Sequence, residues 1–278
     1  MPEGDTLHRT ARVLGAALEG ERIARAEVDG RRSRVEAPAL VGRVVQRVEA
    51  RGKNLLLHLE GSAVLWSHLR MTGAWHVYRR GEPWQKPARQ RTVLLETARA
   101  EAVGFNLPVL ELLPASRIAS HPQLGQLGPD LLAPAFDVPA AVARFRSAPL
   151  QTLGEVLMDQ RLASGIGNVY KSEVLHLCRV DPWLKVVDAE DAVLAGLLEK
   201  ARALMLRNLD GKMRRTAHAA GGERYFVYGR EGRPCRTCDT PIAMARQGDS
   251  ARSTYFCPAC QRVKVEGRTR QQPFRSGC

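Results

Sequence analysis

Four cysteines form two C-x-x-C pairs in the last quarter of the 278-residue chain. Eighteen residues separate the pair Cys235 and Cys238 from the pair Cys257 and Cys260. Two β-turns at this spacing present four thiolates to one tetrahedral ion, and zinc is the metal that such a set favours. Because cysteine fills all four positions, none is left for water. We therefore predict one structural zinc ion.

An arginine lies between the two cysteine pairs. Arg252 precedes Cys257 by five residues, which places it close to the tip of the expected metal-bound hairpin. A rigid arginine at such a tip suits the geometry of a phosphate group. The alternative is an ordinary solvated surface charge, as is common in a basic protein.

The N-terminus carries a second candidate reagent. Removal of Met1 before the small residue Pro2 would leave a secondary amine with a pKa of about 8, against about 10.4 for lysine. Such an amine is a nucleophile at neutral pH, and its addition to an aldehydic carbon gives a cationic iminium that acidifies the neighbouring C–H. Glu3, one residue on, is a candidate acid/base group. Taken alone, these residues also fit an ordinary chain start.

The charge balance indicates the partner. The chain has 42 Lys and Arg against 29 Asp and Glu, a formal net charge of +13. This excess favours a polyanion, with nucleic acid before an anionic membrane surface. A hydrophobic content of 44% excludes general disorder, and the length predicts about two domains. Without an apolar run of membrane-spanning length or a secretory signal, we expect a cytoplasmic protein with no membrane partner.

The sequence pattern changes from mostly strand-like to mostly helix-like at a proline-rich stretch. Residues 5–18 have the apolar spacing of an amphipathic helix, with Leu7, Ala11, Leu14 and Leu18 on one face. The segments that resemble strands of an antiparallel system are 41–48, 54–59, 63–68, 75–78, 92–96 and 109–113. After a linker at 113–139, helices are predicted over 140–146, 153–159, 169–177 and 189–209, and short β-like pieces at 225–230 and 253–257 flank the cysteines.

Six segments, taken together and in order, resemble the formamidopyrimidine-DNA glycosylase/endonuclease VIII family of base-excision repair enzymes. They are PEGDT (2–6), RGKNLLLHL (51–59), SHLRMTGAW (67–75), LGPDLL (127–132), SGIGNVYKSE (164–173), and VYGREGRPC (227–235), which runs into the four cysteines. The resemblance covers nearly the whole chain. PEG near the start is closer to the endonuclease VIII branch, whereas Arg-Met-Thr at 70–72 is closer to the formamidopyrimidine branch.

This resemblance implies an α+β fold: an N-terminal β-sandwich with a leading helix, a helical helix-two-turn-helix domain, and a zinc-finger β-hairpin. The boundaries predicted on this basis are the catalytic domain at 1–114, a linker at 115–138, the helix-two-turn-helix domain at 139–220, the zinc finger at 221–267 and a tail at 268–278.

The resemblance also assigns catalytic roles. Pro2 would attack the sugar C1′ of the damaged nucleotide, and Glu3 would protonate the opening deoxyribose or shuttle protons. Lys53 would contact a phosphate and aid β-elimination, although plain solvation is the alternative for a lysine ahead of a strand. Arg252 would hold the phosphates that flank the lesion and take part in δ-elimination.

Five further residues are predicted to contact DNA. Asn168 begins a helix, where backbone N–H groups favour an anion, although an ordinary helix cap is also compatible; Lys171, one turn on, would add charge. By the resemblance, Met71 fills the hole that a rotated base leaves, although a core methionine is the alternative, and Arg70 contacts DNA. Gln126 stands where some relatives carry an arginine contact. The seven histidines are interpreted as structural or surface residues.

The resulting hypothesis is a bifunctional DNA glycosylase/AP lyase that forms a Schiff base through Pro2 and cleaves the strand by β,δ-elimination, with no redox or nucleotide cofactor. The segment 213–224 is short where the formamidopyrimidine branch carries a loop over 8-oxoguanine, which favours oxidised pyrimidines. The alternatives are an enzyme that prefers 8-oxoguanine or formamidopyrimidine, and a non-catalytic protein that binds damaged DNA. We expect a monomer acting on damaged duplex or single-stranded DNA.

Overall fold

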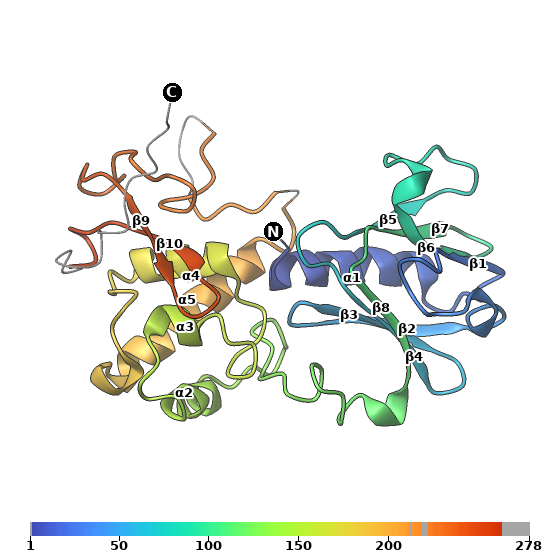
Figure 1. Cartoon of the computed structure of the whole chain (residues 1–278), viewed down its shortest axis with the longest axis horizontal. Helices are drawn as coiled ribbons and strands as arrows, with labels where there is room; N and C mark the ends of the chain where they lie inside the picture. The colour runs from blue at the N-terminus through green and yellow to red at the C-terminus, as the bar shows by residue number, and fades with distance from the viewer. Residues whose placement is uncertain (1, 212, 218–221, 263–278) are drawn as a thin grey trace. The chain divides into compact units, whose positions relative to one another are not determined.

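The computed structural model describes residues 2–211, 213–217 and 222–262, and the chain divides into two compact units at residue 127 (Figure 1). Unit 1 holds the first helix and eight strands. Its elements are α1 (Gly4–Leu18), β1 (Arg25–Val28), η1 (Ala37–Ala39), β2 (Val45–Arg51), β3 (Asn54–Leu59), β4 (Ala63–His68), β5 (Ala74–Tyr78), η2 (Ala88–Gln90), β6 (Arg91–Glu96), β7 (Glu101–Phe105), β8 (Val109–Pro114) and η3 (Ala115–Arg117).

The strands of unit 1 form two four-stranded antiparallel sheets, in the orders β1-β6-β7-β5 and β2-β3-β4-β8. Their inward side chains and the apolar face of α1 share one core, in which Leu14 packs with Leu57 and Leu95. All four residues of the predicted apolar stripe of α1 are buried. Both the leading helix and the sandwich therefore match the predicted class.

Two strands were missing from the sequence interpretation. β1 is a four-residue edge strand with no fully buried side chain, so its apolar signal is weak. β7 includes Gly104, which interrupts the β-branched pattern. A Cβ at this position would lie 2.5 Å from Leu107 and 2.8 Å from Val93, so the core requires the glycine. β2 also begins four residues later than predicted, because Gly42 turns the chain with a φ of +84°.

The predicted linker does not stand apart from the two units. Ile118 and Leu124 pack with Leu56, Val64 and Trp66 in unit 1, and Leu131 and Leu132 join the core of unit 2. The division at residue 127 therefore falls inside the stretch 115–138, and each half belongs to the core of its own unit.

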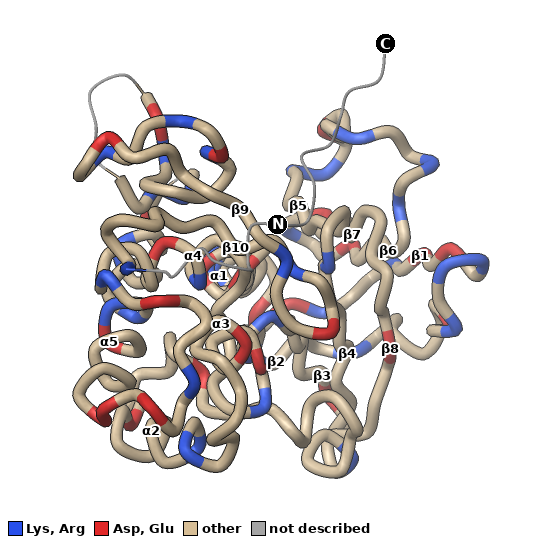
Figure 2. The backbone as a smooth tube through the Cα atoms, turned by 60° about the vertical axis from the view of Figure 1, so that its left-hand side comes forward, with Lys and Arg blue, Asp and Glu red and all other residues tan. Residues whose placement is uncertain are grey.

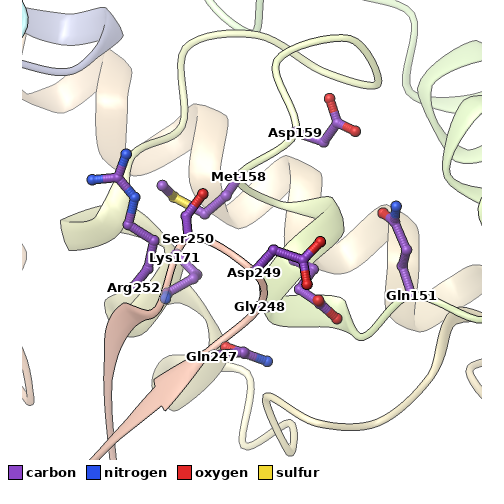
Figure 3. Close-up of a pocket in the computed structure, with 11 residues that line it drawn as sticks. Gln151, Met158, Asp159, Lys171, Gln247, Gly248, Asp249, Ser250 and Arg252 are labelled. Atoms are coloured by element: carbon purple, nitrogen blue, oxygen red, sulfur yellow. The ribbon is translucent and has the colours of Figure 1, made fainter.

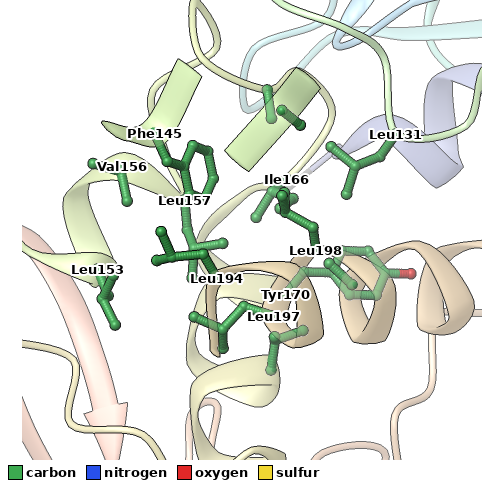
Figure 4. Packing of buried hydrophobic residues seen from close by; sticks show 14 of the residues in the cluster. Leu131, Phe145, Leu153, Val156, Leu157, Ile166, Tyr170, Leu194, Leu197 and Leu198 are labelled. Carbon is green, nitrogen blue, oxygen red and sulfur yellow. The ribbon is translucent and has the colours of Figure 1, made fainter. Parts of the chain in front are cut away.

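The described part of unit 2 is helical and then forms a β-hairpin. Its elements are α2 (Val138–Arg146), α3 (Leu153–Val156), α4 (Asn168–Leu177), η4 (Val186–Asp188), α5 (Asp191–Arg207), β9 (Ala243–Gln247) and β10 (Arg252–Phe256). One buried core holds Leu153 of α3, Tyr170 of α4, and Leu194, Leu197 and Leu198 of α5 (Figure 4). α3 is shorter than the predicted 153–159, and the segment 225–230, expected to be β-like, is not a strand.

Among the residues that the structure describes, none of the helices combines the length and apolar character that crossing a bilayer requires.

Candidate functional site

The four cysteines converge on one point beside the hairpin of unit 2. Their Sγ atoms all lie within 4.8 Å of one another, with separations of 3.8 Å between Cys235 and Cys260 and 3.4 Å between Cys238 and Cys257. Tetrahedral Zn–S bonds of about 2.3 Å place sulfur atoms about 3.8 Å apart. The cluster therefore fits one zinc ion coordinated by sulfur alone, as the spacing predicts.

Arg252 occupies the predicted place at the hairpin tip. It is the first residue of β10, directly after the turn 248–251, and lies opposite Gln247 of β9 in the register. Gly248 and Ala251 turn the chain with φ values of +68° and +47°, and the Ala251 N–H donates to the Gly248 carbonyl at 2.9 Å. The Arg252 side chain is exposed, so its guanidinium is accessible to a ligand.

The structure brings Asn168 and Lys171 of α4 to the same hairpin. Asn168 Nδ2 donates to the carbonyl and the hydroxyl of Ser253 at 2.7 and 3.0 Å, and Lys171 Nζ donates to the Ser253 carbonyl and to Thr254 Oγ1 at 3.2 and 2.7 Å. Only 4% of Asn168 and 1% of Lys171 is exposed. Direct DNA contact by these side chains stays a prediction, but this geometry commits both of them to the hairpin.

A pocket of about 270 Å³ lies beside this tip, between the hairpin and the α3 region (Figure 3). Arg252 stands at one side of the pocket, and Asp159 and Asp249 stand at the other. Lys171 and Gln247 also contribute to its wall. The pocket is part of unit 2 alone and joins the two predicted DNA-binding elements, α4 and the hairpin.

Glu173 is a buried carboxylate that the sequence interpretation did not single out. Its two oxygens accept the backbone N–H groups of Phe226, Val227 and Tyr228, each at 2.8 Å, and the hydroxyl of Thr216. Burial raises the pKa of this carboxyl, and the four hydrogen bonds oppose that shift. These hydrogen bonds take the place of the strand pairing expected for 225–230. They fix the segment that leads into the zinc finger to helix α4.

In unit 1, the predicted nucleophile lies at the start of α1. Glu3 is the N-cap residue and is 0% exposed, and its carbonyl accepts the N–H groups of Thr6 and Leu7 at 2.9 and 3.2 Å. Pro2 immediately before it is half-buried. The helix start therefore fixes the backbone that carries both predicted reactive residues.

Lys53 lies in the two-residue turn between β2 and β3, because Arg51 and Asn54 are paired in the register. Gly52 comes first in the turn with a φ of +59°, a conformation that favours glycine. Asn54 pairs in turn with His68 at the end of β4. The Lys53 turn and the 69–73 turn thus share one end of the sheet, and α1 begins at this same end of unit 1 (Figure 1).

His68 is the residue of this end that the sequence interpretation missed. Its Nδ1 accepts the backbone N–H of Arg70 at 2.9 Å, and burial, helped by the charges of Arg70 and Lys53, lowers its pKa to about 4. The imidazole is therefore neutral at pH 7 with its proton on Nε2. A neutral N–H donor beside two cations suits a phosphate oxygen.

Met71 and Gln126 are both exposed. Met71 has 65% of its surface exposed in the turn 69–73, so the alternative of a core methionine is wrong. Arg70 before it adopts a φ of +45°, and Gly73 is required because a Cβ there would lie 2.6 Å from the Leu69 carbonyl oxygen. Gln126 lies in a turn near the end of unit 1.

Lys and Arg positions are spread over the loops of both units (Figure 2).

Comparison with known proteins identifies the family. Profiles of the formamidopyrimidine-DNA glycosylase N-terminal domain, of its H2TH domain, and of the zinc finger found in FPG and IleRS match residues 1–107, 127–217 and 232–263. The chain is 44% identical over 282 residues to a probable endonuclease 8 2 of Streptomyces coelicolor, covering 99% of this chain and all of that protein. The chain belongs to the formamidopyrimidine-DNA glycosylase/endonuclease VIII family.

A further relative agrees with this family assignment, and a solved structure agrees with the fold. The DNA-(apurinic or apyrimidinic site) lyase Nei2 of Mycolicibacterium smegmatis is 38% identical, over 94% of this chain and 99% of that one. A solved structure of a Lactococcus lactis FPG mutant in complex with Fapy-dG-containing DNA superposes with a TM-score of 0.79 at 22% identity, covering 94% of this chain and all of that one. The family zinc finger spans all four cysteines, so the cluster is a zinc site.

Proposed function

We propose that this protein is a bifunctional DNA glycosylase/AP lyase of base-excision repair. One observation carries the proposal: Pro2 and Glu3 stand at the first turn of α1, with Glu3 fully buried as its N-cap residue, in a chain that matches family members over nearly its whole length. A non-catalytic DNA-binding protein would not need a nucleophile and a carboxyl group held together in this way.

In the proposed reaction, the Pro2 nitrogen, freed by removal of Met1, bonds to C1′ while the glycosidic bond breaks and the base leaves with a proton. Protonation of the ring oxygen by Glu3 opens the sugar and leaves a cationic iminium. Loss of the C2′ proton then breaks the C3′–O bond, and loss of the C4′ proton breaks the C5′–O bond. Water hydrolyses the iminium, so the balance needs no oxidant or reductant.

The remaining residues hold the strand and shape its specificity. Lys53, His68 and Arg70 present two cations and one neutral N–H donor at one end of unit 1, and Arg252 adds a clamp from unit 2. Exposed Met71 is available as the wedge that fills the space of the displaced base. We propose that the protein acts as a monomer, that its zinc ion holds the hairpin rigid, and that zinc takes no part in bond breaking.

Oxidised pyrimidines are the proposed lesions, because the segment 213–224 is short. This segment includes residues outside the described part of the chain, so the proposal rests on its length alone. The Arg-Met-Thr wedge at 70–72 favours a second candidate, a preference for 8-oxoguanine or formamidopyrimidine. Cleavage of matched duplexes that contain thymine glycol or 8-oxoguanine separates the two candidates.

Borohydride trapping on an abasic-site duplex tests the chemistry. We expect the wild-type protein to become covalently attached to DNA, and Pro2→Gly to lose most of this trapping and strand cleavage while it retains most of its DNA affinity. Intact-mass measurement before trapping reports whether Met1 has been removed. Lys200→Met, on the exposed face of α5, is the control and should trap like the wild type.

Two results would contradict the proposal. Equal losses of trapping and of DNA affinity in Pro2→Gly would make Pro2 a structural residue. Full trapping by a protein that still carries Met1 would place the reactive amine elsewhere.

A further inference from the structure

The hairpin that carries Arg252 is held by a chain of buried side chains from three segments of unit 2. Thr254 Oγ1 accepts from Lys171 Nζ at 2.7 Å and donates to Gln247 Oε1 at 2.7 Å. Gln247 Nε2 donates to Thr152 Oγ1 at 2.9 Å and to the Pro182 carbonyl at 2.8 Å. Lys171, Gln247 and Thr254 are 1%, 7% and 0% exposed.

One carbonyl fixes the direction of every bond in this chain. The Pro182 carbonyl can only accept, so the amide nitrogen of Gln247 must face it and Oε1 must face Thr254. The Thr254 hydroxyl therefore donates its proton to Gln247 Oε1 and accepts a hydrogen bond from Lys171 Nζ. The ammonium group of Lys171 supplies only donors, so the pairing is complementary at each step.

The two ends of the chain carry opposite charges. The Thr152 hydroxyl accepts from Gln247 and donates to Glu155 Oε2 at 2.5 Å, and the same carboxylate oxygen accepts the Thr152 N–H at 2.9 Å in the capping box of α3. Every proton points from the Lys171 ammonium toward the Glu155 carboxylate. Hydrogen bonds aligned in this way polarise and strengthen one another in a buried setting.

Arg252 is a close neighbour of two residues in this series of hydrogen bonds. Gln247 is its direct cross-strand partner, and Thr254 is two residues further along the same strand and on the same face. The Arg252 side chain extends away from Gln247, past the hairpin tip (Figure 3). The stem beside Arg252 is thus tied to α3 and α4, while the guanidinium stays accessible.

We infer that Lys171, acting through Thr254 and Gln247, is a positioning residue that sets the place of Arg252 and does not itself bind phosphate. The inference rests on the proposed function, in which Arg252 holds the phosphates beside the lesion. Lys171 reaches the pocket wall but is only 1% exposed, and its Nζ donates to two neighbouring residues of β10. This assignment replaces the DNA contact that the sequence suggested for Lys171.

A double-mutant cycle on the full-length zinc protein tests the inference. Lys171→Met, Arg252→Ala and the double variant are compared in single-turnover cleavage of an abasic-site duplex and in the salt dependence of binding. We expect Lys171→Met alone to slow cleavage about tenfold, and to have less than a twofold effect in the Arg252→Ala background. An independent contribution would instead multiply the two effects.

The salt slope separates positioning from direct contact. Each phosphate contact contributes about −0.9 to the slope of log affinity against log salt concentration. In the Arg252→Ala background, Lys171→Met should leave the slope unchanged, because no contact remains for it to position. A further drop of about 0.9 in that background would show that Lys171 binds phosphate directly and would overturn the inference.

Thr254→Val is the second variant, since it keeps the shape of the side chain and removes the hydroxyl that links Lys171 to Gln247. It should reproduce the cleavage defect and the same non-additivity with Arg252→Ala, at unchanged zinc content. Lys200→Met, which removes an exposed lysine of α5, should match the wild type in every assay. Normal cleavage by both Lys171→Met and Thr254→Val would refute the inference.

Failure of the inference and failure of the proposed function give different results. If Arg252→Ala cleaves like the wild type, the role proposed for Arg252 is wrong. If the wild type forms no borohydride-trapped complex, the proposed chemistry is wrong. If Arg252→Ala is slow and Lys171→Met multiplies that defect, only the positioning role fails.

Discussion

The two units present their candidate functional groups by different physical means. In unit 1, Lys53 and Arg70 lie in short turns whose conformations are set locally, by Gly52 at φ +59° and by the left-handed φ of Arg70 itself. In unit 2, Arg252 depends on partners far away in sequence: Lys171 contacts Thr254 across 83 residues and Gln247 contacts Thr152 across 95. Local geometry can be predicted from a motif, whereas long-range support cannot.

Loss of the metal should produce the largest difference between the two units. Cys257→Ser leaves three thiolates, so we expect zinc to be released and the hairpin to lose its fixed shape, because metal binding and folding are coupled in small zinc modules. DNA affinity should fall at least tenfold. Metal analysis and fluorescence anisotropy with labelled duplex measure the two effects.

Unit 1 should remain folded in the same variant. Trp66, Trp75 and Trp84 belong to unit 1 and only Trp183 to unit 2, so tryptophan fluorescence reports mainly on the sandwich. We expect its urea midpoint to change little. A large shift of that midpoint would show that the hairpin supports both units, and full zinc content with normal affinity would contradict the four-cysteine site.

The sequence predicted what depends on local pattern. The apolar stripe of α1, the four-cysteine cluster and the place of Arg252 at a hairpin tip all follow from spacing, and the structure agrees with each. Edge strand β1 was missed because its side chains are only half-buried. Glu173 gave no local signal, since its partners lie 43 to 55 residues away.

Replacing a glycine of α3 by alanine should show whether packing in unit 2 outweighs helix propensity. Gly154 lies within α3, where alanine would ordinarily be the better helix former. A Cβ at this position would meet the side-chain amide of Gln247 at 2.2 to 2.6 Å. We expect Gly154→Ala to displace Gln247, to cost about 1 to 3 kcal/mol in unfolding free energy, and to slow cleavage.

Gly196→Ala in α5 is the matched control, because outside the adjoining backbone of α5 no atom of the described residues lies within 4 Å of the place that a Cβ would take there. This change should stabilise the protein by about 1 kcal/mol and leave cleavage unchanged. Chemical denaturation and single-turnover cleavage measure both variants. Equal stabilisation by the two alanines would show that Gln247 does not hold α3 and the hairpin together.

The predicted roles of Asn168 and Lys171 show where a motif stops being informative. Their place at the start of α4 suggested a phosphate site, and their residue types are consistent with one. The structure directs both side chains to the backbone of Ser253, and phosphate contact by Asn168 stays a prediction. Only the fold determines whether a cation near a helix start faces solvent or a neighbouring strand.

Another expected effect lies in unit 1 and appears only as the pH falls. The pKa of His68 is lowered to about 4 from an ordinary value of 6.5, so between these values the unfolded chain binds a proton that the folded protein does not. The folded state is therefore penalised as pH falls from 6.5 toward 4, by up to about 3 kcal/mol. His68→Asn retains an acceptor for the Arg70 N–H and cannot be protonated, so its unfolding free energy should fall less over this range.

Urea unfolding followed by tryptophan fluorescence between pH 4 and 7 measures this difference. The pKa values of His76 and His176 are also lowered by burial, so the wild-type curve alone is composite, and the difference from His68→Asn isolates one group. Glu49, whose pKa is lowered to about 2, loses its contribution only below about pH 4.5 and does so in both proteins alike, so it cancels in the difference. Parallel curves for the two proteins would mean that His68 is not held neutral, and the local geometry of unit 1 would then not supply the uncharged donor assigned to it.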